Sequence, residues 1–125
     1  MARVLIVDDT EIVRRALEVA IRRMGHDAAT AADGPQALAM AQEDPPDLAL
    51  LDFRMPGMDG ADLLRALRRS LGERCPRIVW VSATPAEVVA AHTAADGPAA
   101  GFVKKPFSLD DLIRSVDAAL GRPRS

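Results

Sequence analysis

Short apolar runs alternate along the chain with segments of helical periodicity, and this alternation limits the folds that the chain can adopt. The runs are rich in Val, Leu and Ile, and they occupy 3–9, 26–31, 45–52, 77–83 and 101–104, of which 26–31 is the weakest. Runs of this kind that are each followed by a helix are typical of parallel strands buried on both faces. The sequence therefore predicts an α/β fold, a single (βα)5 unit with a doubly wound, five-stranded parallel sheet and helices on both faces.

The segments between and after these runs are expected to be helices. They are 10–24, 33–43, 61–71, 85–95 and a last one from Ser108 to Leu120. In the first, apolar residues recur with the period of one helical face, at Val13, Leu17, Ala20 and Met24. Pro35 suits the first position of the second helix, and Ser108 suits the N-cap of the last. The fourth helix is rich in Ala and has a poor apolar stripe.

Length and charge restrict the class of protein. A chain of 125 residues has the usual size of one domain, and its net charge of −2 provides no general attraction to nucleic acid or to a membrane surface. We expect residues 1–120 to form the domain and 121–125 to be a basic tail or the start of a linker. The single cysteine, Cys75, cannot form an internal disulfide, which favours a cytoplasmic location. No apolar run approaches the roughly 18 residues that a membrane helix needs.

Polar side chains stand at the carboxyl ends of most of the predicted strands. Asp8 and Asp9 end the first strand, Asp52 the third and Ser82 the fourth, and Lys105 follows the fifth. Because parallel strands bring their carboxyl ends to one edge of the sheet, these groups are expected to share a small volume. A single Asp in such a place is usually a helix cap or a turn residue. So many polar groups on separate strands exceed chance placement and indicate a site.

Three carboxylates at one edge need compensation. Two unit charges about 5 Å apart repel by roughly 3 kcal/mol at an effective dielectric constant of about 20. Either the pKa values of the carboxyl groups rise or a cation binds. Clustered hard oxygen ligands favour Mg²⁺ or Mn²⁺, and the lack of Cys or His among them disfavours zinc.

At these positions the chain resembles the receiver domains of bacterial response regulators, which act in two-component signalling. The motifs are "VDD" after the first strand, "LLDFRMPGMDG" around the end of the third, "VSA" at the end of the fourth and "FVKKPF" around the end of the fifth. The resemblance covers residues 3–120. It implies the flavodoxin-like strand order 2-1-3-4-5, which is known from a chemotaxis receiver.

The resemblance assigns chemical roles to the acidic residues. Asp52 is the expected acceptor of a phosphoryl group from a phosphohistidine. Asp9 and Asp52 are expected to bind Mg²⁺ directly together with the backbone carbonyl of Arg54, and Asp8 to bind it through water. The residues agree with this role, because a carboxylate needs no general base and phosphoryl transfer depends on positioning and positive charge.

The same resemblance gives roles to the residues around the acceptor. Lys105 is expected to pair with the phosphoryl oxygens, rather than Lys104, because the lysine of this family directly precedes a proline. The bond to Pro106 is expected to be cis. Ser82 would donate a hydrogen bond to the phosphate, and Phe102 would be the switch aromatic that turns inward when Ser82 moves.

Two further positions are expected to tune the switch. Arg54 and Thr84 each lie two residues after a site residue, where members of this family adjust the lifetime of the acyl phosphate. A long side chain at Arg54 would hinder an attacking water. Trp80 is interpreted as core packing.

The resemblance also implies partners and a mode of action. A sensor histidine kinase or a histidine phosphotransfer protein would act upstream, and an effector would read the surface of the fourth helix, fifth strand and fifth helix. A phosphorylation-dependent homodimer is left open, and neither nucleic acid nor a membrane is an expected direct partner. The domain would be a signalling switch, not an enzyme beyond its own phosphorylation and dephosphorylation. The stretch "AADGPAAGF" departs from the family pattern and puts the partner in doubt.

Other readings fit the residues less well. A flavin-phosphate site would need a loop rich in Gly and hydroxyl groups after the first strand, but "DDTE" would repel phosphate. A phosphatase or mutase with an aspartyl-phosphate intermediate would carry a second acid two residues after its nucleophile, where this chain has Arg54. The domain is expected either to stand alone or to belong to a larger transcription factor or hybrid histidine kinase.

Overall fold

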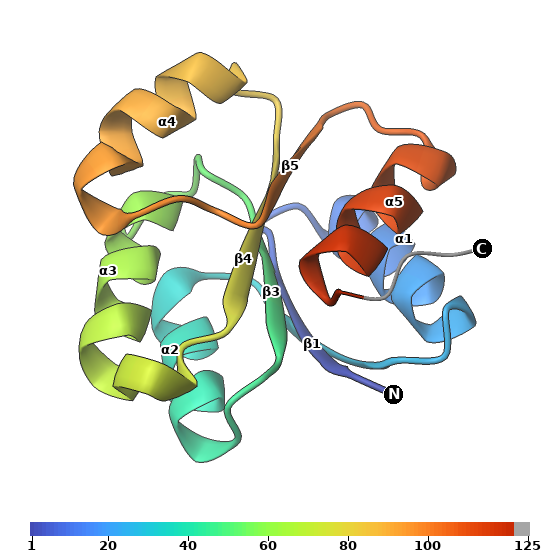
Figure 1. Cartoon of the computed structure of the whole chain (residues 1–125), viewed down its shortest axis with the longest axis horizontal. Helices are drawn as coiled ribbons and strands as arrows, with labels where there is room; N and C mark the ends of the chain where they lie inside the picture. Colours follow the sequence, from blue (N-terminus) through green and yellow to red (C-terminus); the bar gives the residue numbers. More distant parts are fainter. Residues whose placement is uncertain (122–125) are drawn as a thin grey trace.

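One parallel sheet organises the computed structural model, which describes residues 1–121. Within this range five strands lie in the order β2-β1-β3-β4-β5 (Figure 1). Their bounds are β1 Arg3–Val7, β2 Asp27–Ala31, β3 Leu48–Leu51, β4 Arg77–Ser82 and β5 Gly101–Lys104. The predicted α/β class and strand order are confirmed. Most of the predicted tail, including Arg122 and Arg124, lies outside the described residues.

Helices cover both faces of this sheet. They are α1 Glu11–Arg23, α2 Gly34–Glu43, α3 Gly60–Leu71, α4 Ala86–Thr93 and α5 Leu109–Ala119, with 3-10 turns at η1 Gly72–Arg74 and η2 Ala94–Asp96. Helices α2, α3 and α4 lie on one side of the sheet, and α1 and α5 lie on the other (Figure 1). None of the helices in the described range is long and apolar enough to cross a bilayer.

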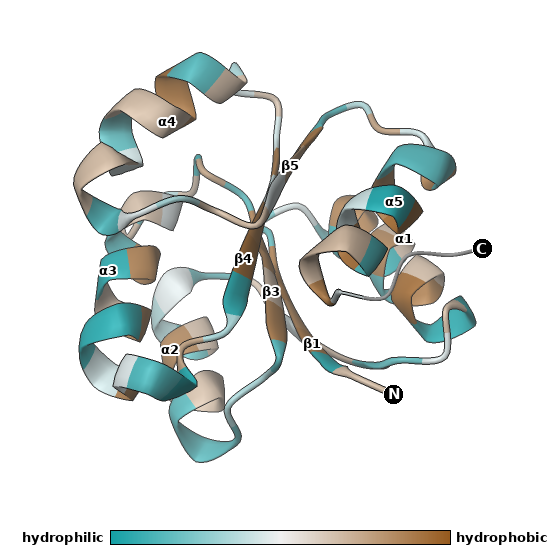
Figure 2. Ribbon diagram, viewed as in Figure 1, coloured by the Kyte–Doolittle hydropathy of each residue, from teal (hydrophilic) through white to brown (hydrophobic). Residues whose placement is uncertain are grey.

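The alternation of side chains along the strands builds two cores, one on each face, as the pleat of a strand requires. On β1, Leu5 and Val7 belong to the core beneath α2 and α3, whereas Val4 and Ile6 belong to the core beneath α1 and α5. The central strands are therefore apolar on both sides, and Figure 2 shows them as largely hydrophobic. This double burial holds the strand ends, and the residues that follow them, in fixed positions.

Three predicted strands, the first, third and fourth, end earlier than expected, and the acids lie in the loops that follow β1 and β3. The predicted strands included Asp8, Asp9 and Asp52, but β1 and β3 stop just before them. The reason is local hydrogen bonding. Asp8 Oδ1 accepts from the N–H of Thr10 at 2.9 Å, and Asp52 Oδ1 accepts from the N–H of Arg54 at 3.4 Å. These bonds turn the backbone away from the sheet.

Helix starts follow the predicted caps with one correction. Ser108 caps α5, because its hydroxyl accepts from the N–H of Asp111 at 3.1 Å. Pro35 was predicted at the first position of the second helix, and this is wrong by one residue. Asp33 caps that helix, so Gly34 takes the first position and Pro35 the second.

The buried face of α1 also differs from the predicted stripe. Leu17 and Ala20 are buried as expected, but Ile21 is fully buried as well, while Val13 and Met24 are only partly buried. Residues three and four apart share a helical face, so Ile21 lies beside Leu17 and faces the sheet. Val13 and Met24 lie near the two ends of the helix, where burial is incomplete.

Candidate functional site

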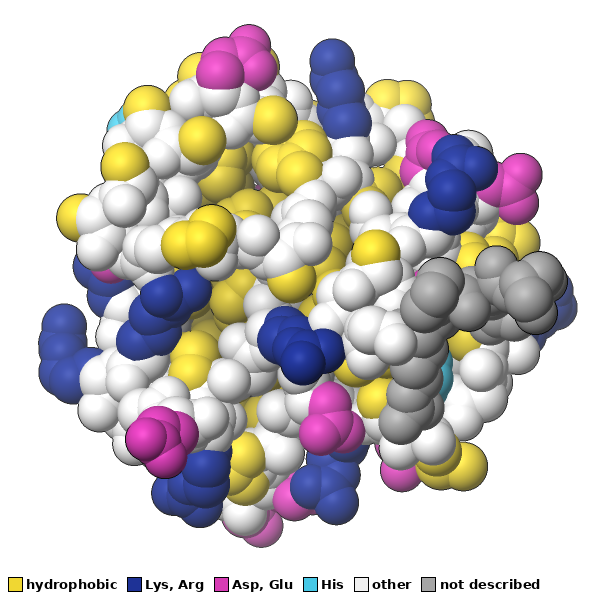
Figure 3. Space-filling view, in the orientation of Figure 1, with side chains coloured by type: hydrophobic (Ala, Val, Ile, Leu, Met, Phe, Trp, Pro, Cys, Tyr) yellow, Lys and Arg dark blue, Asp and Glu magenta, His cyan; other side chains and the backbone are white. Residues whose placement is uncertain are grey.

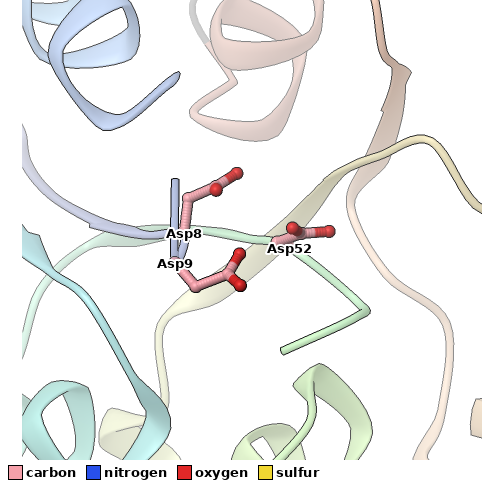
Figure 4. Close-up of side chains that lie close together, drawn as sticks. All are labelled: Asp8, Asp9 and Asp52. Carbon is pink, nitrogen blue, oxygen red and sulfur yellow. The ribbon is translucent and has the colours of Figure 1, made fainter. Parts of the chain in front are cut away.

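Three carboxylates meet where β1 and β3 end. These strands are neighbours with Val7 paired to Leu51, so the loops that follow them start side by side. Asp8, Asp9 and Asp52 each place one carboxylate oxygen within 4.8 Å of the others (Figure 4). The parallel sheet thus brings together acids that are distant in the sequence.

A lysine ammonium joins two of these acids. Lys105 Nζ lies 2.6 Å from Asp8 Oδ2 and 3.2 Å from Asp52 Oδ2. Asp8 is 1% exposed and Asp52 is 7% exposed, whereas Asp9 is exposed. Lys104 is also exposed, so the structure turns the lysine that directly precedes Pro106 toward the acids. The Lys105–Pro106 bond is cis, as predicted.

Burial sets the electrostatics of this pair. The pKa of Asp52 is raised, because burial disfavours its charged form and the nearby Asp8 adds repulsion, and Lys105 opposes both effects only in part. Burial alone would lower the pKa of Lys105, but its hydrogen bond to Asp8 and the charge of Asp52 outweigh burial and raise it. The ammonium therefore stays charged, and three acids beside one cation leave an excess of negative charge.

The donor set fits a hard divalent cation. All three groups offer carboxylate oxygens, the ligands that Mg²⁺ prefers, and none of the clustered residues is a Cys or His. Asp9 makes no hydrogen bond or ion pair with any residue between 1 and 121, so its oxygens are free to coordinate. Both oxygens of Asp8 already accept hydrogen bonds, from Thr10 and Lys105. Asp52 likewise accepts from Arg54 and Lys105, so of the three acids Asp9 alone has both carboxylate oxygens without a partner among residues 1–121.

The hydroxyl residues line the end of β4, next to β3. Ser82 is 1% exposed, and its Oγ accepts a hydrogen bond from the N–H of Thr84 at 3.1 Å. The Ser82 carbonyl accepts from the N–H of Lys105 at 2.9 Å, which ties the end of β4 to the lysine loop. Thr84 is buried, while Arg54 on the opposite loop is exposed.

The aromatic residues lie below this edge. Phe102 on β5 pairs in register with Trp80 on β4 and is partly buried, while Trp80 is 2% exposed and belongs to the core. Phe53 directly follows Asp52 and packs edge-on against Trp80, with ring centroids 5.8 Å apart. The ring of His92 on α4 packs against the same Phe53 at 5.5 Å.

The sequence reasoning missed three of the groups around the site. Arg14 on α1 donates from Nη1 to the Asp8 carbonyl at 2.7 Å, Phe53 joins Asp52 to His92, and Gly60 packs directly against the backbone of Asp52. The adjacency of Phe53 to Asp52 was visible in the sequence. The partners of all three depend on distances across the fold.

Comparison with known proteins identifies the family. The model of the family described as "Response regulator receiver domain" matches residues 4–117. The chain is 37% identical over 120 residues to DNA-binding response regulator MtrA of Mycolicibacterium smegmatis, covering 96% of this chain and 51% of that protein. It is 35% identical over 129 residues to transcriptional regulatory protein KdpE of Mycobacterium tuberculosis, covering 98% of this chain and 52% of that protein.

A solved structure agrees. The fold of the chain is similar to that of chemotaxis protein CheY4 of Vibrio cholerae, with a TM-score of 0.88, 30% identity and coverage of 96% of this chain and 99% of that one. The chain spans about half the length of the two curated relatives, which are 51% and 52% covered. The match of 4–117 takes in four strands whole, all of β1 but its first residue and nearly all of the last helix, together with the acids and the lysine that the sheet brings together. The chain therefore belongs to the response regulator receiver domain family, whose members are phosphorylation-based switches of two-component signalling.

Proposed function

We propose that Asp52 accepts a phosphoryl group from the phosphohistidine of a sensor histidine kinase or a histidine phosphotransfer protein. The observation that carries this proposal is the setting of the Asp52 carboxylate, which is 7% exposed, lies 3.2 Å from Lys105 Nζ and shares an edge with two further acids. Such a carboxylate is held rigidly enough to react and is still reached from outside.

In the proposed transfer Asp52 is the nucleophile and Lys105 supplies positive charge. Lys105 stabilises the ionised form of Asp52, so that a carboxylate oxygen attacks phosphorus without a general base. As the bond from phosphorus to the histidine nitrogen breaks, charge spreads over the phosphoryl oxygens. Lys105 is close enough to pair with those oxygens.

Asp9, Asp52 and the backbone carbonyl of Arg54 would hold Mg²⁺ or Mn²⁺, with Asp8 acting through water. The ion would supply positive charge to the phosphoryl oxygens. The occupied oxygens of Asp8 and the free ones of Asp9 support this division.

The hydroxyl of Ser82 would report the phosphate to the rest of the domain. It would donate to a phosphoryl oxygen and draw the loop that contains Thr84 toward the site. A cavity of about 540 Å³ between α4 and β5, partly lined by Phe102, leaves room for that ring to turn. An effector would then read the altered surface of α4, β5 and α5, and a phosphorylation-dependent homodimer is one form that the output would take.

Response-regulator receivers work with histidine kinases and effectors, and they are switches more than enzymes. We place this domain at residues 1–120 and in the cytoplasm, with no direct contact to nucleic acid or membrane. A second candidate role is that of the receiver part of a longer transcriptional regulator, which the DNA-binding and transcriptional relatives favour.

The proposal is tested by chemical trapping. The protein is incubated with Mg²⁺ and acetyl phosphate, and its intact mass should rise by one phosphoryl group. Borohydride reduces an aspartyl phosphate to homoserine, so peptide mapping of the reduced protein should place homoserine at position 52. An absence of adduct, or a homoserine at another position, would contradict the assignment.

Mg²⁺ is expected to raise the melting temperature, because binding to the folded site relieves the repulsion among the acids. At a concentration one hundred times the Kd, a ligand stabilises the folded state by about 2.7 kcal/mol. In a domain of this size that corresponds to a rise of roughly 10 °C. Thermal melts with and without Mg²⁺ measure it.

Asp9→Asn should remove most of the Mg²⁺ effect and should itself stabilise the metal-free protein by lowering the repulsion. The matched control is Asp27→Asn, an exposed acid at the opposite edge of the sheet, which should keep the full response. Equal responses to Mg²⁺ in both variants would remove Asp9 from the metal site.

Arg54→Ala is expected to shorten the life of the phosphorylated state severalfold. The exposed Arg54 side chain follows the acceptor and would hinder an attacking water, while the variant keeps the backbone carbonyl. The loss of the adduct after removal of acetyl phosphate is followed by intact mass, with Arg54→Lys as the control that keeps the length. Identical decay in all three proteins would show that the side chain does not shield the site.

A further inference from the structure

Helix α4 is held loosely along most of its length. Only Val89 and Thr93 are buried in it, and Ala86 and Ala90, which have small side chains, also line the cavity beside β5. The cavity of about 540 Å³ lies between this helix and β5, and Figure 3 shows apolar side chains gathered on that face. A helix with so little buried apolar surface opens at a low free-energy cost.

The carboxyl-terminal end of α4 is attached more firmly. The ring of His92 meets the ring of Phe53 at an interplanar angle of 67°, and His92 Nδ1 lies 2.9 Å from the carbonyl of Val88. Arg65 on α3 donates to the His92 carbonyl at 3.0 Å and to the Asp96 carboxylate at 3.2 Å. This end of the helix is therefore joined to α3 and to the loop that carries Asp52.

Phe53 cannot shift independently of Asp52. It is the next residue in the chain, it is 5% exposed, and its ring is wedged between Trp80 and His92. Its carbonyl accepts a hydrogen bond from the N–H of Gly60 at 2.8 Å. A displacement of the backbone at Asp52 therefore moves the surface on which His92 rests.

We propose that His92, through its contact with Phe53, is a positioning residue that couples the state of Asp52 to the position of α4. This coupling rests on the proposed function, because it begins with a phosphoryl group on Asp52. The contact between Phe53 and His92 acts on the carboxyl-terminal end of α4, whereas the loop after Ser82 leads into the amino-terminal end of this helix. The helix is thus biased from both ends, and the cavity beside β5 gives it space to move.

Hydrogen exchange of the peptide that covers 86–93 tests this coupling. In the wild-type protein, acetyl phosphate with Mg²⁺ should change the exchange rate of this peptide. In His92→Ala the change in exchange rate caused by phosphorylation should be about fivefold smaller. This factor corresponds to the loss of one aromatic contact. His92→Phe keeps a ring against Phe53 and should restore the wild-type change.

Glu87→Ala, an exposed change at the other end of the same helix, should leave the response as in the wild type. The extent of phosphorylation is measured by intact mass in each sample. A fully phosphorylated His92→Ala protein with the wild-type response would overturn the inference, as would a phosphorylated wild-type protein whose α4 does not respond. A wild-type protein that takes no phosphate on Asp52 would instead overturn the proposed function.

Discussion

Asp52→Asn is expected to lose the phosphoryl adduct completely and to melt at a higher temperature than the wild-type protein in the absence of Mg²⁺. The first effect follows because the amide offers no nucleophilic carboxylate oxygen. The second follows because burial and the charge of Asp8 raise the pKa of Asp52, which means that its charged form destabilises the metal-free fold. The neutral amide removes this cost and still accepts a hydrogen bond from Lys105.

The stabilisation should depend on pH in a defined direction. The folded protein holds the proton of Asp52 more tightly than the unfolded chain does, for which 3.8 is the ordinary pKa. Stability therefore falls as pH rises from that value through the raised pKa, and the full destabilisation is present above it. Urea unfolding should show the variant to be more stable than the wild type at neutral pH, and the two should converge below pH 3.8.

Asp27→Asn is the control for phosphorylation and for stability. It should change neither, because Asp27 is the first residue of β2 and the site lies at the opposite, carboxyl-terminal edge of the sheet. A phosphoryl adduct that persists in Asp52→Asn would place the acceptor on another residue. A variant less stable than the wild type at neutral pH would mean that the ion pair with Lys105 outweighs burial.

Gly60→Ala is expected to destabilise the fold and to slow phosphorylation in a single step. A Cβ at this position would collide with the carbonyl oxygen of Asp52, and it would lie 2.6 Å from Trp80 Cζ3 and 2.8 Å from Phe53 Cα. Two of these atoms belong to the backbone and the third to a buried ring, so none can move away cheaply. Overpacking of this kind costs about 1–3 kcal/mol.

Thermal melts should show a decrease of roughly 4 °C for each kcal/mol in a domain of this size. The displaced Asp52 should also react about a hundredfold more slowly with acetyl phosphate, because small misplacements of a reacting group are costly. Gly34→Ala is the matched control. It too is the first residue of a helix, but its Cβ would meet only the flexible side chain of Met58. Equal effects of both substitutions would refute the role of the close approach.

Much of the fold followed from local patterns in the sequence. Strands appeared as apolar runs because burial on both faces requires them, and the cap at Ser108 appeared because a hydroxyl satisfies a free helix N–H. The strand order came from the family resemblance, not from the residues alone. Errors occurred where a local pattern fitted two positions. Pro35 suits either of the first two positions of a helix, and the cap at Asp33 places it at the second.

The sequence predicted which residues form the candidate site, but it did not predict most of the contacts among them. The motif around Asp52 and the lysine before Pro106 named the reactive groups. The resemblance could not show that Lys105 holds both Asp8 and Asp52, because this contact joins residues 97 positions apart. Gly60 was visible only as a small residue after a turn, since its neighbour Trp80 comes from another strand.

By itself, the sequence determined which segments become strands and helices and which acids stand at the strand ends, because periodicity and capping act over a few residues. The tertiary structure alone decided the bridge from Lys105 to two buried carboxylates, the space denied to a side chain at Gly60 and the contact between Phe53 and His92. These features depend on how strands and helices pack, and packing sets distances between residues that no local pattern connects.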